Sequence, residues 1–128
     1  MQYEYFYGAQ AEQFSFYRIP KALFTEPNFR ELSTDAKVLY GILLDRMSLS
    51  LKNQWLDAQN KVYIIFTVEE IMDALNCANQ KAMRLMVELE KQVGLIERKR
   101  QGLGRPNLIY IKNFAATIND KSCEKGDS

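Results

Sequence analysis

The chain contains no histidine and only two cysteines, Cys77 and Cys123, among its 128 residues. Without histidine, the usual general base and the most common transition-metal ligand are both missing. Two cysteines far apart in the sequence do not complete a structural zinc site, and they favour a protein with free thiols in the cytoplasm. We therefore expect no bound metal, no other cofactor and no catalytic activity.

The sequence also lacks a long hydrophobic run. Its apolar stretches are short and interrupted by charged residues, so no segment is predicted to span a membrane. The N-terminus is aromatic and has neither the basic nor the aliphatic region of a signal peptide. A hydrophobic content of 47% and a charged content of 26% are ordinary for a globular protein, and the length suits one compact domain.

The net charge of +1 conceals an uneven distribution. Residues 1–78 carry 7 basic and 10 acidic side chains, residues 79–112 carry 8 and 3, and residues 113–128 carry 2 and 3. The positive charge is therefore concentrated in the middle segment, a pattern that indicates a polyanionic partner such as a nucleic acid. A solvated basic hairpin without a ligand is the alternative that charge alone leaves open.

Aromatic residues crowd the N-terminal segment. They are Tyr3, Tyr5, Phe6, Tyr7, Phe14, Phe16 and Tyr17. Rings at this density need a surface to pack against, which is either the chain's own core or a second copy of the chain. We favour an arm that makes a homodimer. Residues 1–15 are thus predicted to form this arm, residues 16–114 the folded domain, and residues 115–128 a flexible tail or the start of an interdomain linker.

Hydrophobic periodicity and capping residues predict the first part of the domain. The run Ser33-Thr34-Asp35 offers an N-cap for a long helix, whose apolar face continues to about Leu49. A β-branched and aromatic run at residues 62–66 predicts a buried strand. Thr67 and Glu70 then form a capping-box pattern at the start of a short helix.

A second helix follows after the tight connection at residues 76–78. It is predicted to run from Gln80 to about Val93, with Asn79 as its cap. Two helices joined in this way form a helix-turn-helix unit, and the first outward residues of the second helix are placed to enter the major groove of DNA. The outward face is predicted to carry Gln80, Lys81, Arg84, Val87, Glu88 and Lys91. An ordinary solvated helix would carry similar residues.

A basic hairpin completes the pattern. Gly94 is expected to end the second helix, residues 95–98 and 108–111 are predicted strands, and the glycines within residues 101–104 supply the turn. A helix followed by a basic hairpin is typical of a winged-helix domain that grips the DNA backbone. The sequence therefore predicts an α+β winged helix-turn-helix fold, mostly helical, with a small antiparallel sheet and a basic wing.

Four blocks of the sequence carry a resemblance to a known family. They are FYRIPKALF at residues 16–24, LSTDAKVLYGILLDR at residues 32–46, ELE at residues 88–90 and GLIERKRQGLGRPN at residues 94–107. Over residues 16 to about 114, the chain resembles the N-terminal domain of the RepA-type replication initiators carried by Gram-positive, especially staphylococcal, plasmids.

This resemblance implies a domain that binds repeated sites in a plasmid origin as double-stranded DNA. In that family a separate C-terminal domain recruits host replication proteins, and the expectation is that this chain is an isolated DNA-binding part without it. The predicted DNA-binding residues are Asn79, Gln80, Lys81, Arg84, Arg98, Lys99, Arg100, Gln101, Arg105 and Asn107. A winged-helix transcription regulator and a winged helix that binds an acidic protein are the alternative functions.

Overall fold

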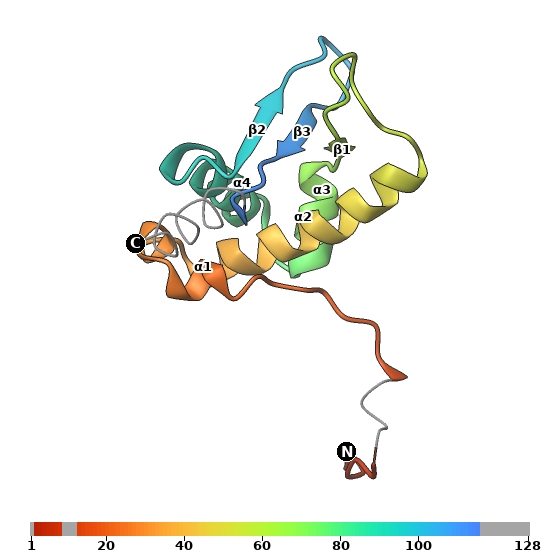
Figure 1. The fold of residues 1–128 in the computed structure, drawn as a ribbon, viewed down its shortest axis with the longest axis vertical. Coiled ribbons are helices and arrows are strands. Elements are labelled where there is room, and N and C mark those ends of the chain that lie inside the picture. The colour runs from red at the N-terminus through yellow and green to blue at the C-terminus, as the bar shows by residue number, and fades with distance from the viewer. Residues whose placement is uncertain (1, 9–12, 116–128) are drawn as a thin grey trace, which may run out of the picture.

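The computed structural model describes residues 2–8 and 13–115. Its elements are α1 (Ala22–Thr25), the 3₁₀ helix η2 (Pro27–Phe29), α2 (Thr34–Lys52), β1 (Tyr63–Ile65), α3 (Val68–Leu75), α4 (Asn79–Val87), the π-helix η3 (Glu88–Gln92), β2 (Ile96–Lys99) and β3 (Leu108–Ile111). Figure 1 shows α3, α4 and the three strands gathered around α2, while the described part of the N-terminal arm extends away from this body. Among the described residues, no helix is both long and apolar enough to cross a membrane.

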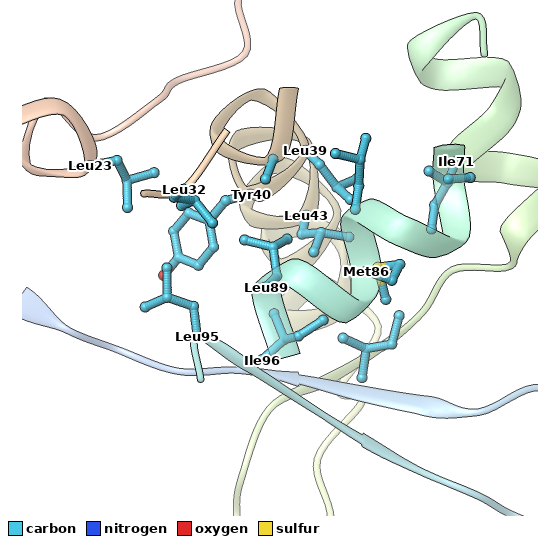
Figure 2. Close-up of a cluster of buried hydrophobic side chains, with 14 of the residues drawn as sticks. Leu23, Leu32, Leu39, Tyr40, Leu43, Ile71, Met86, Leu89, Leu95 and Ile96 are labelled. Carbon is cyan, nitrogen blue, oxygen red and sulfur yellow. The ribbon is translucent and has the colours of Figure 1, made fainter. Parts of the chain in front are cut away.

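The long helix α2 forms the centre of the core. Its predicted cap is confirmed, because the side-chain oxygen of Ser33 accepts a hydrogen bond from the backbone N–H of Ala36 at 3.1 Å. One face of α2 is buried against the other elements, in the cluster shown in Figure 2. That cluster includes Leu23, Leu39, Leu43, Ile71, Met86, Leu89 and Ile96. Each fully buried aliphatic side chain contributes about 1.5–3 kcal/mol, so this packing joins the helices to the sheet.

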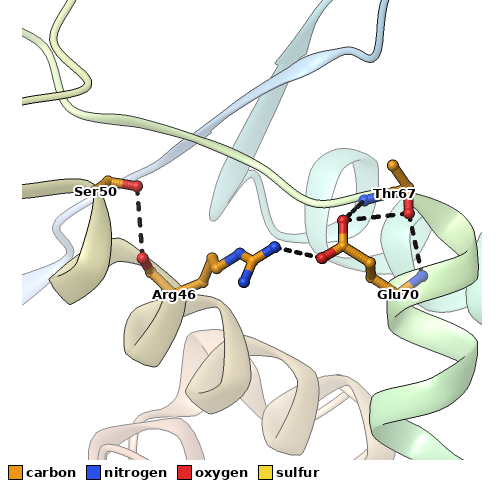
Figure 3. A network of polar contacts seen from close by, with 4 residues as sticks. All are labelled: Arg46, Ser50, Thr67 and Glu70. Carbon is orange, nitrogen blue, oxygen red and sulfur yellow. Dashed lines mark hydrogen bonds and ion pairs between the residues drawn. The ribbon is translucent and has the colours of Figure 1, made fainter. Parts of the chain in front are cut away.

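The short helix α3 begins with the capping box that the sequence predicts. Thr67 Oγ1 accepts a hydrogen bond from the Glu70 backbone N–H, and Glu70 Oε1 accepts one from the Thr67 backbone N–H, both at 3.1 Å. The other oxygen of Glu70 pairs with Arg46 of α2, as Figure 3 shows. The Arg46 guanidinium also lies 5.1 Å from the ring centre of Phe66. Glu70 therefore fixes both the start of α3 and its position against α2.

The three strands form an antiparallel sheet in the order β1-β3-β2. Ile64 of β1 and Ile109 of β3 are paired and buried in the core. In β2, Ile96 is buried in the same core, and Arg98 lies on the same face because strand side chains alternate. Lys99 therefore points to the opposite face, which separates two residues that are adjacent in the basic run.

The predicted strands are confirmed to within one residue at each end, but the second helix of the pair differs from its prediction in two ways. The prediction that Asn79 caps this helix is wrong, because Ala78 occupies the cap position and provides no side-chain hydrogen bond. The left-handed conformation of Asn76, with φ of 52°, ends α3 and leaves Ala78 extended, so Asn79 is already helical. The α-helix also ends at Val87 and continues as η3, a change that hydrophobic periodicity does not detect.

Tyr40 gives the fold a testable dependence on alkaline pH. Its side chain is buried, its hydroxyl donates a hydrogen bond to the backbone oxygen of Lys112 at 2.8 Å, and burial raises the pKa of Tyr40 to about 12. Unfolding returns this pKa to about 10, so the stabilisation is complete below pH 10 and is lost as the pH rises towards 12. We expect the free energy of unfolding, measured with urea across this range, to fall more steeply in the wild type than in Tyr40→Phe. Parallel profiles for the two proteins would contradict this expectation.

Candidate nucleic-acid interface

The helix α4 presents a mixed polar and apolar face to solvent. Asn79, Gln80 and Arg84 are exposed, and Met83 and Val87 are exposed beside them. Within the described part of the chain, the Arg84 side chain makes no ion pair or hydrogen bond, so all of its donors are available to an external acceptor. This face combines long hydrogen-bond donors with apolar groups, the chemistry that distinguishes base pairs in the major groove.

Lys81 differs from its neighbours on α4 because it is already paired. Its Nζ lies 2.8 Å from Oδ2 of Asp35, in the first turn of α2. Both side chains are about half exposed, so the contact is a surface ion pair and contributes at most about 1 kcal/mol. The structure brings Lys81 to the predicted face with its charge partly compensated.

The wing joins β2 to β3 and carries most of the residues that the sequence predicts to contact the DNA backbone. Its exposed predicted residues are Lys99, Arg100, Gln101, Arg105 and Asn107. Gly102 and Gly104 have φ of 119° and 77°, values that favour glycine in the turn. The side-chain amide nitrogen of Gln101 donates a hydrogen bond to the backbone carbonyl of Pro106 at 2.8 Å and closes the tip of the wing.

The basic side chains of the wing divide into free and paired groups. Within residues 2–8 and 13–115, Lys99, Arg100 and Arg105 form no side-chain hydrogen bond or ion pair. Arg98 instead turns inward to Glu90 of η3: its Nη2 and Nε lie 2.8 and 3.2 Å from Oε1, and its backbone N–H donates to Oε2 at 3.2 Å. These hydrogen bonds from Arg98 lower the pKa of Glu90. The structure therefore does not bring Arg98 to the free basic surface that the sequence predicts.

The predicted outward face of the second helix is wrong at Glu88. It was expected to point into solvent, but it is only 8% exposed. Its carboxylate accepts hydrogen bonds from the backbone N–H and the hydroxyl of Ser33, the latter at 2.9 Å. Two acidic side chains, Glu88 and Glu90, thus fix the C-terminal end of α4 to the rest of the domain. Sequence reasoning did not identify Glu90 as the partner of Arg98. The signal for it is the alternation of side chains along β2, which turns Arg98 towards the helix side of the sheet.

A groove of about 890 Å³ is lined by residues of α2, the turn at residues 57–62, β2 and β3. It includes Lys99 of the wing but no residue of α4. Beside it, Asp57 accepts hydrogen bonds from the backbone N–H groups of Lys61 and Gln59 and from the Tyr110 hydroxyl. These hydrogen bonds, led by that from Lys61, lower the pKa of Asp57. In the described residues no group of three or more histidine, cysteine, aspartate or glutamate side chains is placed to hold a metal ion.

The fold and this surface together define a class of protein. A helix-turn-helix formed by α3 and α4 packs beside a three-stranded antiparallel sheet, and a basic hairpin follows the second helix. This is a winged helix-turn-helix domain of the α+β class, as the sequence predicts. The chain belongs to the family described as the N-terminus of replication initiator protein A (RepA), which it matches over residues 15–125.

Solved structures share this fold over nearly the whole chain. One, described as "N-Terminal domain of DNA binding protein", is 35% identical, with a TM-score of 0.72 over 99% of this chain and 98% of that chain. A second, "Structure of Rep-DNA complex", has the same identity and TM-score over 98% of each chain. A third, "Structure of MDR initiator", is 38% identical, with a TM-score of 0.67 over 93% of this chain and 98% of that chain.

A longer relative also matches. The "41 kDa protein" of Lactobacillus helveticus is 30% identical over 102 residues, which are 75% of this chain and 29% of the relative. The chain therefore spans less than a third of the length of this relative.

The contact between Glu88 and Ser33 predicts a measurable loss of stability. We expect Glu88→Ala to lower the free energy of unfolding by about 1–3 kcal/mol, because two partly buried donors of Ser33 lose their acceptor. Glu88→Gln retains an acceptor and should lose less. Urea denaturation measures both changes, with Glu31→Ala as a control, since Glu31 is exposed and its loss should change stability by less than about 0.5 kcal/mol. Equal stabilities for Glu88→Ala and Glu31→Ala would refute the role of this contact.

Proposed function

We propose that this domain binds double-stranded DNA at repeated sites in a plasmid replication origin. The observations that carry the proposal are the exposed polar face of α4 and a wing in which the side chains of Lys99, Arg100 and Arg105 have no partner among the described residues. Membership of the RepA N-terminal family and likeness to a solved structure described as a Rep-DNA complex support it. Family membership also favours an initiator over a transcription regulator with the same fold.

The recognition helix would supply the contacts to bases. Asn79 and Gln80 lie at the N-terminus of α4, where side chains reach the base edges of the major groove. Glutamine pairs well with adenine and arginine with guanine, so Gln80 and Arg84 are the proposed base contacts. Val87, 42% exposed, would touch a thymine methyl group. Lys81 would contact a base or a phosphate after exchanging its partner Asp35.

The wing would hold the DNA backbone. Lys99, Arg100 and Arg105 are proposed as the charged contacts to phosphates, with Gln101 and Asn107 as neutral ones. Each neutralised phosphate releases condensed counterions, so the affinity should fall steeply as salt rises.

Other parts of the initiator would complete its activity. We propose that host replication proteins are recruited by a part of the protein other than this domain, as in the RepA-type initiators that the chain resembles. The chain spans 29% of the length of its Lactobacillus relative. The place of action would be the bacterial cytoplasm, where the origin lies.

The aromatic arm at residues 1–15 would join two copies into a dimer. Tyr3, Tyr5 and Tyr7 are 84%, 82% and 68% exposed, and Phe6 contacts Phe14 edge-to-face at 5.9 Å between ring centres. Exposed rings in such number favour burial in an interface. A dimer would engage two half-sites at once.

The division between base and phosphate contacts predicts two kinds of mutant. Arg84→Ala should weaken binding to a duplex selected by the wild-type domain from a random pool by about 1–3 kcal/mol, and should change binding to a scrambled duplex little. Arg100→Ala should weaken both duplexes alike and reduce the slope of log K against log salt by about 0.9. Fluorescence anisotropy over a salt series measures both effects. If Arg84→Ala binds the selected duplex as the wild type does, Arg84 has no base-contacting role.

Removal of the arm should change the oligomeric state. We expect the intact chain to sediment as a dimer at micromolar concentration and a variant without residues 1–15 to sediment as a monomer, because the exposed rings are lost. Analytical ultracentrifugation, with unfolding of the truncated variant followed in parallel, distinguishes loss of the interface from loss of the fold. A monomeric intact chain would contradict the proposed arm.

A further inference from the structure

The short π-helix η3 lies between the recognition helix and the wing. It covers Glu88–Gln92 and continues directly from α4, and the chain enters β2 four residues later at Ile96. A π turn widens the helix, and such turns occur often at functional sites. In this domain, η3 brings the carboxylates of Glu88 and Glu90 into contact with two different parts of the fold.

The first carboxylate ties the end of the recognition helix to α2. Glu88 accepts hydrogen bonds from the backbone N–H and hydroxyl of Ser33, the residue that caps α2. The second ties the same turn to the wing, because Glu90 accepts three hydrogen bonds from Arg98. The two contacts hold α4 and β2 in a fixed relation to the core.

The backbone hydrogen bond is the most informative part of the Arg98 contact. β2 is an edge strand, so its outward N–H groups have no partner in the sheet. Glu90 Oε2 accepts the outward N–H of Arg98, while Oε1 holds the guanidinium. The contact with Glu90 therefore fixes both the backbone of β2 and the side chain of Arg98. It does so at the point where the chain enters the wing through Lys99 and Arg100.

Arg98 is also a poor candidate for a phosphate contact. The side chains of Arg98 and Glu90 are 26% and 20% exposed, so the pair is mostly shielded from solvent. If Arg98 moved to a phosphate, it would leave Glu90 unpaired, half-buried and close to the negative charge of the DNA. A charge left unpaired in such surroundings is costly.

We propose that η3 couples the recognition helix to the wing through the Glu90–Arg98 pair, and that Arg98 is a positioning residue for DNA binding and not a phosphate contact. This inference rests on the proposed function of the domain. It removes Arg98 from the set of phosphate contacts and adds Glu90, an acidic residue, to the residues on which DNA affinity depends.

Salt dependence separates a positioning role from a phosphate contact. We expect Arg98→Ala and Glu90→Ala to weaken binding to the selected duplex about tenfold, the size of effect of a lost charge-assisted hydrogen bond. Neither should change the slope of log K against log salt, because no phosphate contact is lost. Arg100→Ala is the matched control, and its slope should fall by about 0.9. Glu90→Gln retains an acceptor and should recover part of the affinity.

The outcomes are distinguishable. A slope for Arg98→Ala that falls as far as that of Arg100→Ala would overturn the inference and leave the proposed function intact. Unchanged affinity in Glu90→Ala would also overturn it. If the wild-type domain binds neither the selected nor the scrambled duplex at low salt, both the proposed function and the inference fail. Thermal unfolding identifies any variant that has lost the fold, and Glu90→Gln, the mildest change, then carries the comparison.

Discussion

The position of α4, the proposed recognition helix, depends on the carboxylate of Glu88. Helix α2 has Ser33 at its cap but Ala36 three residues later, where a capping box carries glutamate or glutamine. Glu88, which is 55 residues away in the sequence, supplies the missing acceptor for the Ser33 N–H. Its negative charge also lies at the N-terminus of α2, where the helix dipole favours an anion. One contact therefore completes the cap of the central helix α2 and anchors α4.

The remaining polar contacts extend from this arrangement. Arg46 joins α2 to Glu70 at the start of α3, and the Tyr40 hydroxyl joins α2 to the backbone just after β3. The two helices of the helix-turn-helix and the sheet are thus each bonded to α2 as well as packed on it. Arg98 of β2 then joins the start of the wing to Glu90 in η3, the turn that follows α4. For the proposed DNA binding, a surface held at so many points is already organised in the free domain, which reduces the entropy lost on binding.

Much of the fold follows from local patterns. The capping box of Thr67, the buried periodic face of α2 and the alternation in the strands all act over a few residues, so the sequence predicts them well. The prediction fails where a local rule meets a distant partner. Asn79 has a good capping side chain, but the left-handed turn at Asn76 moves the cap to Ala78. Glu88 has the spacing of an outward residue, but η3 and Ser33 draw it into the interior.

The sequence by itself determined the order of the elements, the capping box of α3 and the concentration of basic residues in one segment, because each depends on neighbours in the chain. Only the tertiary structure decided which of those charges are free. Lys81 and Arg98 are paired with Asp35 and Glu90, while Arg100 remains open to solvent. These pairings depend on how helices and strands meet in space. A list of basic residues therefore predicts that a surface is positive, and the packing of the domain determines which side chains are available to a partner.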